Sequence, residues 1–315
     1  GGMNADVHQP AQVQTSPPDG EQQRLSDLYD HGVLDGASNE QLDRIVSLAA
    51  EILGTPIALI SLVDRDRQWF LSRHGLEVRE TPRDVAFCNH AILSDRVFVV
   101  ADALQDSRFQ DNPLVQGDPK IRFYAGAPLI SRSGQRLGTL CTIDRQPHLT
   151  TPYQIDLLTQ LSAMAMHEIN HLRDQRLCSL TQVLTRQALL KEGESALQKA
   201  LLQGNRPVLV TFAVTGLRQL NAQADGASQV DQRLLRIAAV CRDHGGAAGV
   251  VGRSGGGEFS LIWADDHLVE QRLQDLKRDL EAVAPPLQLR VVITATEPGT
   301  TELKGLLERA AAALP

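Results

Sequence analysis

The chain has 315 residues, of which 42% are hydrophobic and 22% are charged, and its formal net charge is −7 at pH 7. This length predicts two domains, and this composition is typical of a soluble globular protein with buried cores. The acidic balance argues against a nucleic-acid surface. The absence of an apolar run of about 20 residues argues against a membrane span. The four cysteines are scattered without a CxxC pair, which favours a reducing cytoplasm.

The first 20 residues are rich in Gln, Pro, Ser and Asp and hold almost no large apolar side chain. Such a segment buries too little apolar surface to offset its ordering entropy, so we expect residues 1–20 to be a disordered tail. The glycine pair before the first Met is typical of an expression remnant. From 21 to 53, apolar residues recur at spacings of three and four, which predicts helices and an N-cap at Ser38 or Asn39.

Short runs of apolar and β-branched residues follow, and they are typical of strands. They lie at 56–64, in the next segment "RQWFLSRHG", and at 98–102, 121–131 and 135–144. The turn "RSG" between the last two runs predicts a hairpin. We therefore predict an α+β domain over 21–150, in which five antiparallel strands form a sheet with helices packed on one face.

Residues 151–178 are expected to link this domain to the next, with one long helix from 152 to about 176. The apolar positions of this helix fall on a heptad stripe with Ser162 as the one polar gap, and they are Ile155, Leu158, Ala165, Ile169 and Leu172. The stripe predicts either a dimer stalk, formed with a second copy of the helix, or packing onto its own domain. We favour the dimer stalk.

Residues 179–315 predict a second α+β domain, also with a mostly antiparallel sheet flanked by helices. Strand patterns lie at 207–214, at 287–296 and in a glycine-rich hairpin at 250–263. Helical patterns lie at 180–203, 217–224, 229–244, 266–283 and 300–313.

Four segments of the first domain, "PIALISLVDRDRQWFLSRHGLEVRETPRDVAFCNHAIL", "DALQDSRFQDNPLV", "IRFYAGAPLI" and "RLGTLCTID", together resemble a GAF domain of the bacterial sensor type. The resemblance spans about residues 21–150 and implies a module that binds a small molecule or dimerises. A ligand would lie between the sheet and a cap of short helices and loops. The segments that face this place carry the pocket candidates Phe70, Phe87, Cys88, His90, Phe123 and Tyr124. We favour the interpretation in which the aromatic residues are core and the pocket is small or empty.

Cys88 and His90, two positions apart, allow three more specific interpretations of this segment. With His74 and Cys141 they would form a metal set, but the four lack paired ligand spacing, and we expect no metal. In phytochrome-related GAF domains a Cys-His pair carries a bilin, but Asn89 interrupts the pair here, and we expect no chromophore. A reactive thiol at Cys88 is the third, although free cysteines are usually inert and buried.

In the second half, "RSGGGEF" (253–259) resembles the signature turn of a GGDEF domain, whose usual form is R-x-G-G-D/E-E-F. The segments "SLTQVLTRQALL", "LVTFAVTGLRQLNAQ" and "VDQRLLRIA" resemble further motifs of that family, and all occur in its order. The resemblance runs from about residue 178 to the end. An active member is a diguanylate cyclase, which condenses two GTP into cyclic di-GMP by metal-assisted phosphoryl transfer.

Carried over position by position, this resemblance implies that most of the acidic metal site is gone. The metal-binding aspartate of the first strand falls on Ala213, and the catalytic acid of the signature falls on Gly257. Of the metal site only Glu258 remains, and Mg²⁺ needs protein carboxylates beside substrate oxygens. We therefore predict a degenerate domain in which no catalytic set is intact.

The resemblance also indicates which nucleotide-binding residues survive. Asn221 and Asp231 match the guanine-reading pair of the family, with a spacing one residue longer than usual. The product-inhibition motif falls on Gly246 and Gly249 and is lost, so we expect no feedback binding of cyclic di-GMP there. The other nucleotide-binding candidates are Arg218, Arg253, Gly255 and Gly256.

A purely structural interpretation of the signature turn stays open beside this one. Gly255 and Gly256 would then serve a hairpin that needs positive φ angles. Phe259 would be core, and Arg253 and Glu258 would form a surface pair.

Loss of a single electrostatic stabiliser of a transition state costs about 10²–10³ in rate, so we expect no meaningful turnover. The sequence thus predicts a cytoplasmic signalling protein without a certain cofactor, whose second domain binds a protein partner, or GTP without turnover. We expect a homodimer through the GAF domain and linker helix, and neither nucleic acid nor membrane as a partner. The alternative function is a weakly active diguanylate cyclase, which would need Mg²⁺.

Overall fold

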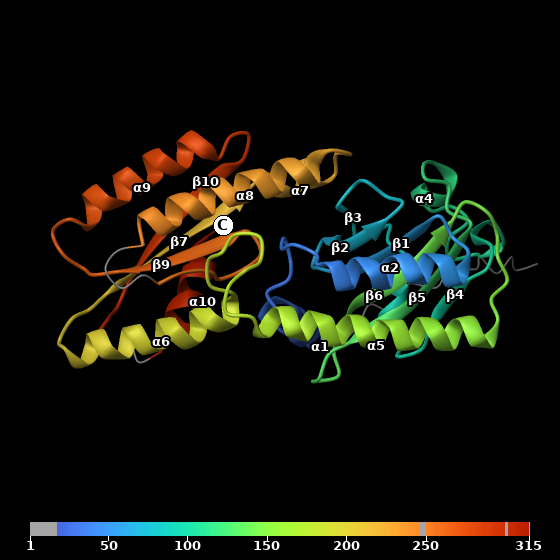
Figure 1. The fold of residues 1–315 in the computed structure, drawn as a ribbon, viewed down its shortest axis with the longest axis horizontal. Coiled ribbons are helices and arrows are strands. Elements are labelled where there is room, and N and C mark those ends of the chain that lie inside the picture. The colour runs from blue at the N-terminus through green and yellow to red at the C-terminus, as the bar shows by residue number, and fades with distance from the viewer. Residues whose placement is uncertain (1–17, 246–249, 300–301, 315) are drawn as a thin grey trace, which may run out of the picture.

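The computed structural model describes residues 18–245, 250–299 and 302–314 of the chain. Two domains lie side by side along the longest axis of the molecule, and the long helix α5 (Pro152–Asp174) leads from the first to the second (Figure 1). Each domain has one antiparallel sheet with helices, so the predicted α+β class is confirmed.

The first domain begins earlier than predicted. The tail expected at 1–20 lies mostly outside the described residues, but 18–20 already belong to helix α1 (Pro18–Asp30). Helix α1 is stabilised against the first domain because its Leu25 and Leu28 are buried in the core of that domain. Burial of apolar side chains is the main source of helix stability in a folded protein.

The first sheet has six strands in the order β3–β2–β1–β6–β5–β4, and all neighbours are antiparallel. The strands are β1 (Ile57–Val63), β2 (Arg67–His74), β3 (Glu80–Pro82), β4 (Phe98–Val100), β5 (Phe123–Ile130) and β6 (Arg136–Asp144). The strand missed by the sequence is β3, whose three residues give no periodicity and are defined only by pairing with β2.

Helices cover both faces of this sheet rather than one. On one face lie α1, α2 (Glu40–Leu53) and α5, and on the other lies α3 (Cys88–Ala91) with the cap loops that carry α4 (Pro113–Gln116) and the 3₁₀ turn η1 (Ala103–Gln105). Every residue of β1 is therefore buried, which explains its continuous apolar run. Asn39 is the N-cap of α2, because its side chain accepts a hydrogen bond from the backbone N–H of Leu42 at 2.9 Å.

The stripe on α5 packs onto its own domain, so the predicted dimer stalk on that stripe is wrong. Leu158, Ala165 and Ile169 are completely buried in the core shared with the sheet and α2. These side chains have no surface left for a second copy of the helix.

The second sheet has the order β10–β7–β9–β8 and is also antiparallel. Its strands are β7 (Val208–Thr215), β8 (Val251–Arg253), β9 (Glu258–Trp263) and β10 (Gln288–Ala295). The helices are α6 (Arg186–Leu202), α7 (Leu217–Asn221), α8 (Gly226–Asp243), α9 (Val269–Val283) and α10 (Leu303–Ala313). The first of these starts later than predicted, because Thr185 caps it and the preceding Leu184 bridges to Leu177.

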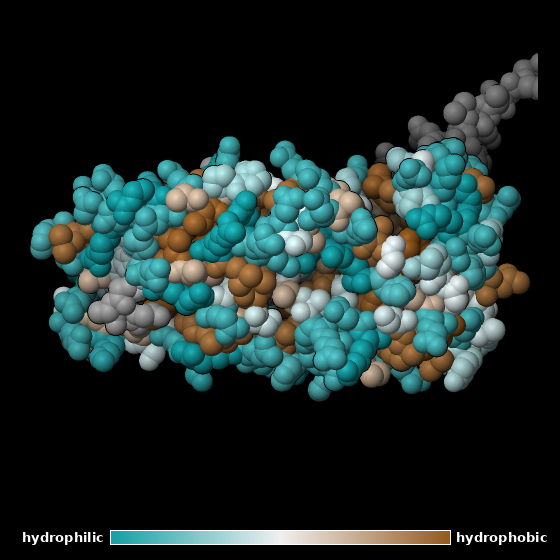
Figure 2. Space-filling model, turned by 45° about the horizontal axis from the view of Figure 1, so that its top comes forward, coloured by the Kyte–Doolittle hydropathy of each residue, from teal (hydrophilic) through white to brown (hydrophobic). Residues whose placement is uncertain are grey.

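The surface is mostly hydrophilic, with apolar patches scattered over the face shown in Figure 2. Within the described residues, every helix is too short or too polar to cross a bilayer.

Candidate functional site between the two domains

Strand β7 and the hairpin between β8 and β9 bring together the two degenerate metal-site positions, Ala213 and Gly257, and the remnant Glu258. Ala213 on β7 pairs with Glu258 on β9, and the backbone N–H of Val214 donates to the carbonyl of Gly257 at 2.7 Å. The three positions thus form one contiguous patch, as the resemblance implied. Within the described part of the chain, no group of three or more His, Cys, Asp or Glu side chains is placed to hold a metal ion.

Glu258 is a poor remnant of a metal site. Burial raises the pKa of its carboxyl, and the charge of Arg186 opposes this only in part. Arg186 itself donates to the carbonyl of Ser254 and lies 3.5 Å from the carboxylate of Asp30, which belongs to the first domain. Magnesium is usually held by protein carboxylates together with substrate oxygens, so a single buried carboxyl offers little to a divalent cation.

The glycines of the signature turn are needed for close contacts and not for unusual backbone angles. Neither Gly255 nor Gly256 has a positive φ angle, so that part of the structural interpretation is wrong. An added Cβ on Gly256 would lie 2.5 Å from Oδ2 of Asp35, and one on Gly257 would lie 2.9 Å from Cδ1 of Leu217. Gly256 therefore lets a loop of the GAF-like domain approach the turn.

Arg253 is buried and does not pair with Glu258, which corrects the predicted surface pair. Its Nη2 donates to the backbone carbonyl of Asp35 at 2.9 Å and to that of Gly256. Its guanidinium also lies 5.5 Å from the ring of Phe259, which is fully buried as predicted. Arg253 thus joins the two domains and is not free for a ligand in this conformation.

Asn221 and Asp231, the predicted guanine readers, lie on α7 and α8 and face the β2–β3 segment of the first domain. The backbone N–H of Arg79 donates to the backbone carbonyl of Asn221 at 2.8 Å. The guanidinium of Arg79 donates to both carboxylate oxygens of Asp231, at 2.7 and 3.3 Å. Asn221 also donates from Nδ2 to Glu80 at 3.3 Å.

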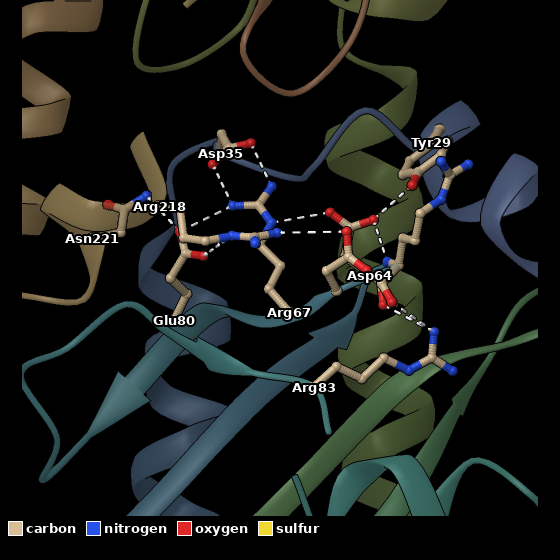
Figure 3. A network of polar contacts seen from close by, with 10 residues as sticks. Tyr29, Asp35, Asp64, Arg67, Glu80, Arg83, Arg218 and Asn221 are labelled. Atoms are coloured by element: carbon tan, nitrogen blue, oxygen red, sulfur yellow. Dashed lines mark hydrogen bonds and ion pairs between the residues drawn. The ribbon is translucent and has the colours of Figure 1, made fainter. Parts of the chain in front are cut away.

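Figure 3 shows Arg67 at the centre of the polar network beside this contact. Its guanidinium donates to Asp35 at 2.7 and 2.9 Å, to Asp64 at 3.0 Å and to Glu80 at 3.2 Å. Burial would raise the pKa of Asp35, but Arg67 holds it below its usual value. Burial raises the pKa of Glu80, and Arg67 compensates for this only in part.

Arg218, the predicted phosphate-contacting residue, lies at the rim of this network. Its side chain is 61% exposed and approaches the carboxylate of Glu80 at 3.8 Å and that of Asp66 at 3.9 Å. It is the most accessible cation of this contact among the residues described above. The sequence did not predict that acids of the first domain would approach Arg218. The only sequence signal for these acids was the dense charge of "DRDRQ" and "EVRETPRD".

The candidate pocket of the first domain is filled by its own side chains. Phe70, Phe87, Cys88 and Tyr124 are at most 3% exposed. The ring of Phe87 stacks on that of Phe109, with 4.2 Å between centroids, and on that of Tyr124 at 5.4 Å. These aromatic residues form the core beneath the cap, as the favoured interpretation predicts.

Phe123 does not belong to the pocket set. It precedes Tyr124 on β5, and neighbouring residues of a strand point to opposite faces. Phe123 therefore packs in the core on the α2 and α5 side, with its ring centroid 4.9 Å from that of His148. His90 is half-buried at the cap, 4.8 Å from the ring of Phe109.

The four residues of the suggested metal set do not come together. Cys88 and Cys141 are buried in the same core, whereas His74 is exposed at the end of β2 beside Ser47. The Sγ of Cys88 lies 3.1 Å from the hydroxyls of Tyr124 and Thr139. Burial opposes ionisation, but hydrogen bonds from Cys141, Thr139 and Tyr124 hold the pKa of the Cys88 thiol below its usual value.

Known proteins resemble each half separately. Residues 38–169 match the family model of the GAF domain. A curated relative from Pseudomonas aeruginosa, the cyclic di-GMP phosphodiesterase PA2567, is 45% identical over 157 residues, which make up 50% of this chain and 27% of that protein. The chain thus spans about a quarter of the length of this relative.

Solved structures of both kinds are similar at low identity. The GGDEF domain of DgcB from Caulobacter crescentus, in complex with c-di-GMP, is 21% identical with a TM-score of 0.40, over 44% of this chain and 85% of that one. The GAF domain of an Acinetobacter phosphoenolpyruvate-protein phosphotransferase is 18% identical with a TM-score of 0.36, over 49% of this chain and 92% of that one. TM-scores below 0.5 carry no weight for function. The chain therefore carries a GAF domain over residues 38–169, followed by a half whose motifs resemble those of a GGDEF domain.

Proposed function

We propose that this chain is a regulatory module of cyclic di-GMP signalling, in which a GAF domain controls a cyclase-like domain that makes no cyclic di-GMP. The observation that carries the proposal is the pairing of Ala213 with Glu258 beside Gly257. Two of the three positions where the family resemblance expects metal-binding acids have no side-chain oxygen.

The residues present do not fit a pair of Mg²⁺ ions. Two-metal phosphoryl transfer uses carboxylates to fix the ions that neutralise the phosphate oxygens. Here one carboxyl remains, and burial raises its pKa. Because the loss of one stabiliser costs about 10²–10³ in rate, the loss of two acids supports an inactive domain even if their effects are not additive.

Regulation by contact is supported by what the GAF domain covers. Arg79 and Glu80 engage Asn221 and Asp231, and the loop that carries Asp35 lies on Arg253 and Gly256. A GAF domain that changed its shape or its oligomeric state would move these contacts directly. The released surface would then bind a protein partner, or GTP without turnover.

The link to cyclic di-GMP rests on two resemblances. The motifs of the second half resemble those of diguanylate cyclases, and the relative from Pseudomonas aeruginosa is named a cyclic di-GMP phosphodiesterase. The module would therefore adjust the level of this nucleotide through a partner or a neighbouring domain.

Turnover tests the proposal. The full chain is incubated with GTP and Mg²⁺, and nucleotides are separated by ion-exchange chromatography and identified by mass spectrometry. We expect no cyclic di-GMP from the wild type or from the matched Glu258→Gln variant. Product from the wild type that disappears in Glu258→Gln would contradict the proposal and establish the alternative, a weakly active diguanylate cyclase.

A further inference from the structure

Asn221 and Asp231 form an acceptor site that is occupied in this conformation. The backbone N–H of Arg79 donates to the backbone carbonyl of Asn221 at 2.8 Å, and its guanidinium donates to the two carboxylate oxygens of Asp231 at 2.7 and 3.3 Å. The Arg79 side chain is 11% exposed, so it has left water almost completely for this site. A carboxylate that accepts a planar fork of two N–H donors is a specific recognition geometry, and not a chance surface pair.

The first domain holds Arg79 rigidly in this position. The backbone carbonyl of Arg79 accepts from the N–H of Phe70 at 2.7 Å, and its guanidinium lies 5.6 Å from the ring of Trp69. Both partners belong to β2, so the arginine is presented by the sheet of the GAF domain.

The closed contact is nevertheless incompletely satisfied. Oδ1 of Asn221 and Oε2 of Glu80 are buried, and neither has a hydrogen-bond partner among the residues that the structure describes. Each buried acceptor without a donor costs free energy, which reduces the stability of the closed contact relative to an open one. Contacts between domains of one chain are typically polar and separable, as this one is.

We propose that Arg79 is an internal ligand of the Asn221–Asp231 site, and that guanine nucleotides compete with the GAF domain for it. This inference rests on the proposed function, because it concerns binding to the same cyclase-like domain. A guanine base presents its N1–H and its N2 amino group side by side, in the way the guanidinium presents two N–H donors. Adenine has an acceptor at N1, which would face the carboxylate oxygens of Asp231. These oxygens are acceptors too, so no hydrogen bond would form there.

The charges around the site favour a nucleotide over an arginine-containing peptide. Arg218 is largely exposed at the rim of the same contact, and the two acids that approach it, Glu80 and Asp66, belong to the first domain. When the contact opens, these acids leave with the first domain, so Arg218 would attract phosphates and weaken the binding of a cationic peptide beside Asp231. The displacing ligand is therefore an anion that carries a guanine base.

Calorimetry on four forms of the full chain tests the competition: wild type, Arg79→Ala, Asp231→Ala and a control, Arg278→Ala. Arg278 is 70% exposed, and within the described part of the chain its ion pairs are with Asp275 and Asp279 of its own helix. Each form is titrated with GTP, ATP and N-acetyl-arginine amide. We expect Arg79→Ala to bind GTP about tenfold or more tightly than wild type, because the closed state no longer withholds the site. Asp231→Ala breaks the same contact but also removes the carboxylate that would accept from guanine, so its affinity for GTP should not rise. The control should bind GTP as tightly as wild type.

Three results would overturn the inference: equal GTP affinity in Arg79→Ala and wild type, an equal gain for ATP, or a gain for N-acetyl-arginine amide alone. Circular dichroism checks that each variant is folded. Should Arg79→Ala unfold, Arg79→Lys replaces it, because lysine keeps the charge but cannot present two parallel donors. Turnover of GTP, which tests the proposed function, is a separate readout, so the two proposals can fail independently.

Discussion

At the scale of single residues, the Arg67 guanidinium is shared by carboxylates from three segments of the first domain. Its side chain is 12% exposed, and Asp35, Asp64 and Glu80 are 3%, 14% and 2% exposed. Removing the cation would leave three carboxylates close together with little water around them. Breaking a buried ion pair from one side costs about 3–5 kcal/mol, because the remaining charge is uncompensated.

We therefore expect Arg67→Met to lower the free energy of unfolding of the GAF domain by about 3 kcal/mol or more. Urea unfolding followed by circular dichroism measures it. The matched control is Arg44→Met, whose ion pair with Glu40 is exposed on both sides and should change the free energy by less than about 0.5 kcal/mol. Similar losses in the two variants would show that the Arg67 network does not stabilise the fold.

Glu80 predicts a pH dependence of stability. Burial raises its pKa in the folded protein above the ordinary value of 4.5, and it faces Arg67, Asp35, Arg218 and Asn221. The folded protein therefore binds this proton more tightly than the unfolded chain. The resulting stabilisation is complete below pH 4.5 and is lost as the pH rises through the folded pKa.

Glu80→Gln removes this titration and keeps an oxygen for Arg67 and Asn221. We expect wild type to lose stability relative to Glu80→Gln as the pH rises from about 4 to about 8. Urea unfolding of both proteins across that range measures the difference, in which the other titrating groups cancel. A difference that stays constant with pH would contradict the assignment.

Some residue contacts could be predicted from the sequence and others could not. Ala213 and Glu258 lie on predicted neighbouring elements of a recognisable domain, so their proximity followed from the family resemblance. The contact of Arg253 with Asp35 joins residues 218 positions apart in different domains, and no local pattern records it. The wrong assignment of Phe123 to the pocket was avoidable, because the alternation of side chains along a strand already places it on the opposite face from Tyr124.

At the scale of elements, the signature turn and the loop before α2 fit together through Gly256. An added Cβ there would lie 2.5 Å from Oδ2 of Asp35, so the loop or the turn must shift. We expect Gly256→Ala to destabilise the protein by about 1–3 kcal/mol, as overpacking does, in thermal unfolding. Gly305→Ala is the control, because its added Cβ on α10 meets nothing within 4 Å and should stabilise the helix by up to about 1 kcal/mol. Gly256→Ala at least as stable as the wild type would show that the turn and the loop do not touch in solution.

For the homodimer expected through the GAF domain and the linker helix, we propose the surface between α2 and α5. Leu48 and Met164 are 44% and 55% exposed beside a groove of about 340 Å³ between these helices. We expect wild type to be a dimer in light scattering after gel filtration, and Leu48→Glu with Met164→Glu to be a monomer. Leu202→Glu, at an 87% exposed position on α6, should leave the dimer intact. A monomeric wild type would refute the prediction.

Elements with strong periodicity were the ones that the sequence predicted well. Apolar runs predict five strands to within a few residues, namely β1, β5, β6, β7 and β10. A capping side chain likewise predicts the N-cap of α2. The short strand β3 and the burial of α5 depend on partners far along the chain. An apolar stripe shows that a helix packs on something, but the fold decides on what.

At the scale of the whole molecule, the claim is that the GAF domain keeps the Asn221–Asp231 surface closed. This follows from contacts made by the β2–β3 loop, β3 and the loop at Asp35 with α7, α8 and the signature turn. Figure 3 shows the contact between Glu80 and Asn221. Regulation then needs no change inside the second domain. In this proposal, separation of the two domains would expose the surface, and the GAF domain would set how often this happens.

Hydrogen–deuterium exchange of the intact chain tests this claim most directly, with wild type compared to Asp231→Ala. In wild type, peptides that cover 77–81 and 217–226 should exchange slowly, because the N–H of Arg79 is bonded to Asn221 across the contact. In the variant both peptides should exchange faster, while peptides from β5 and β6 stay unchanged. Fast exchange at both segments in wild type, or no change in the variant, would contradict the closed arrangement.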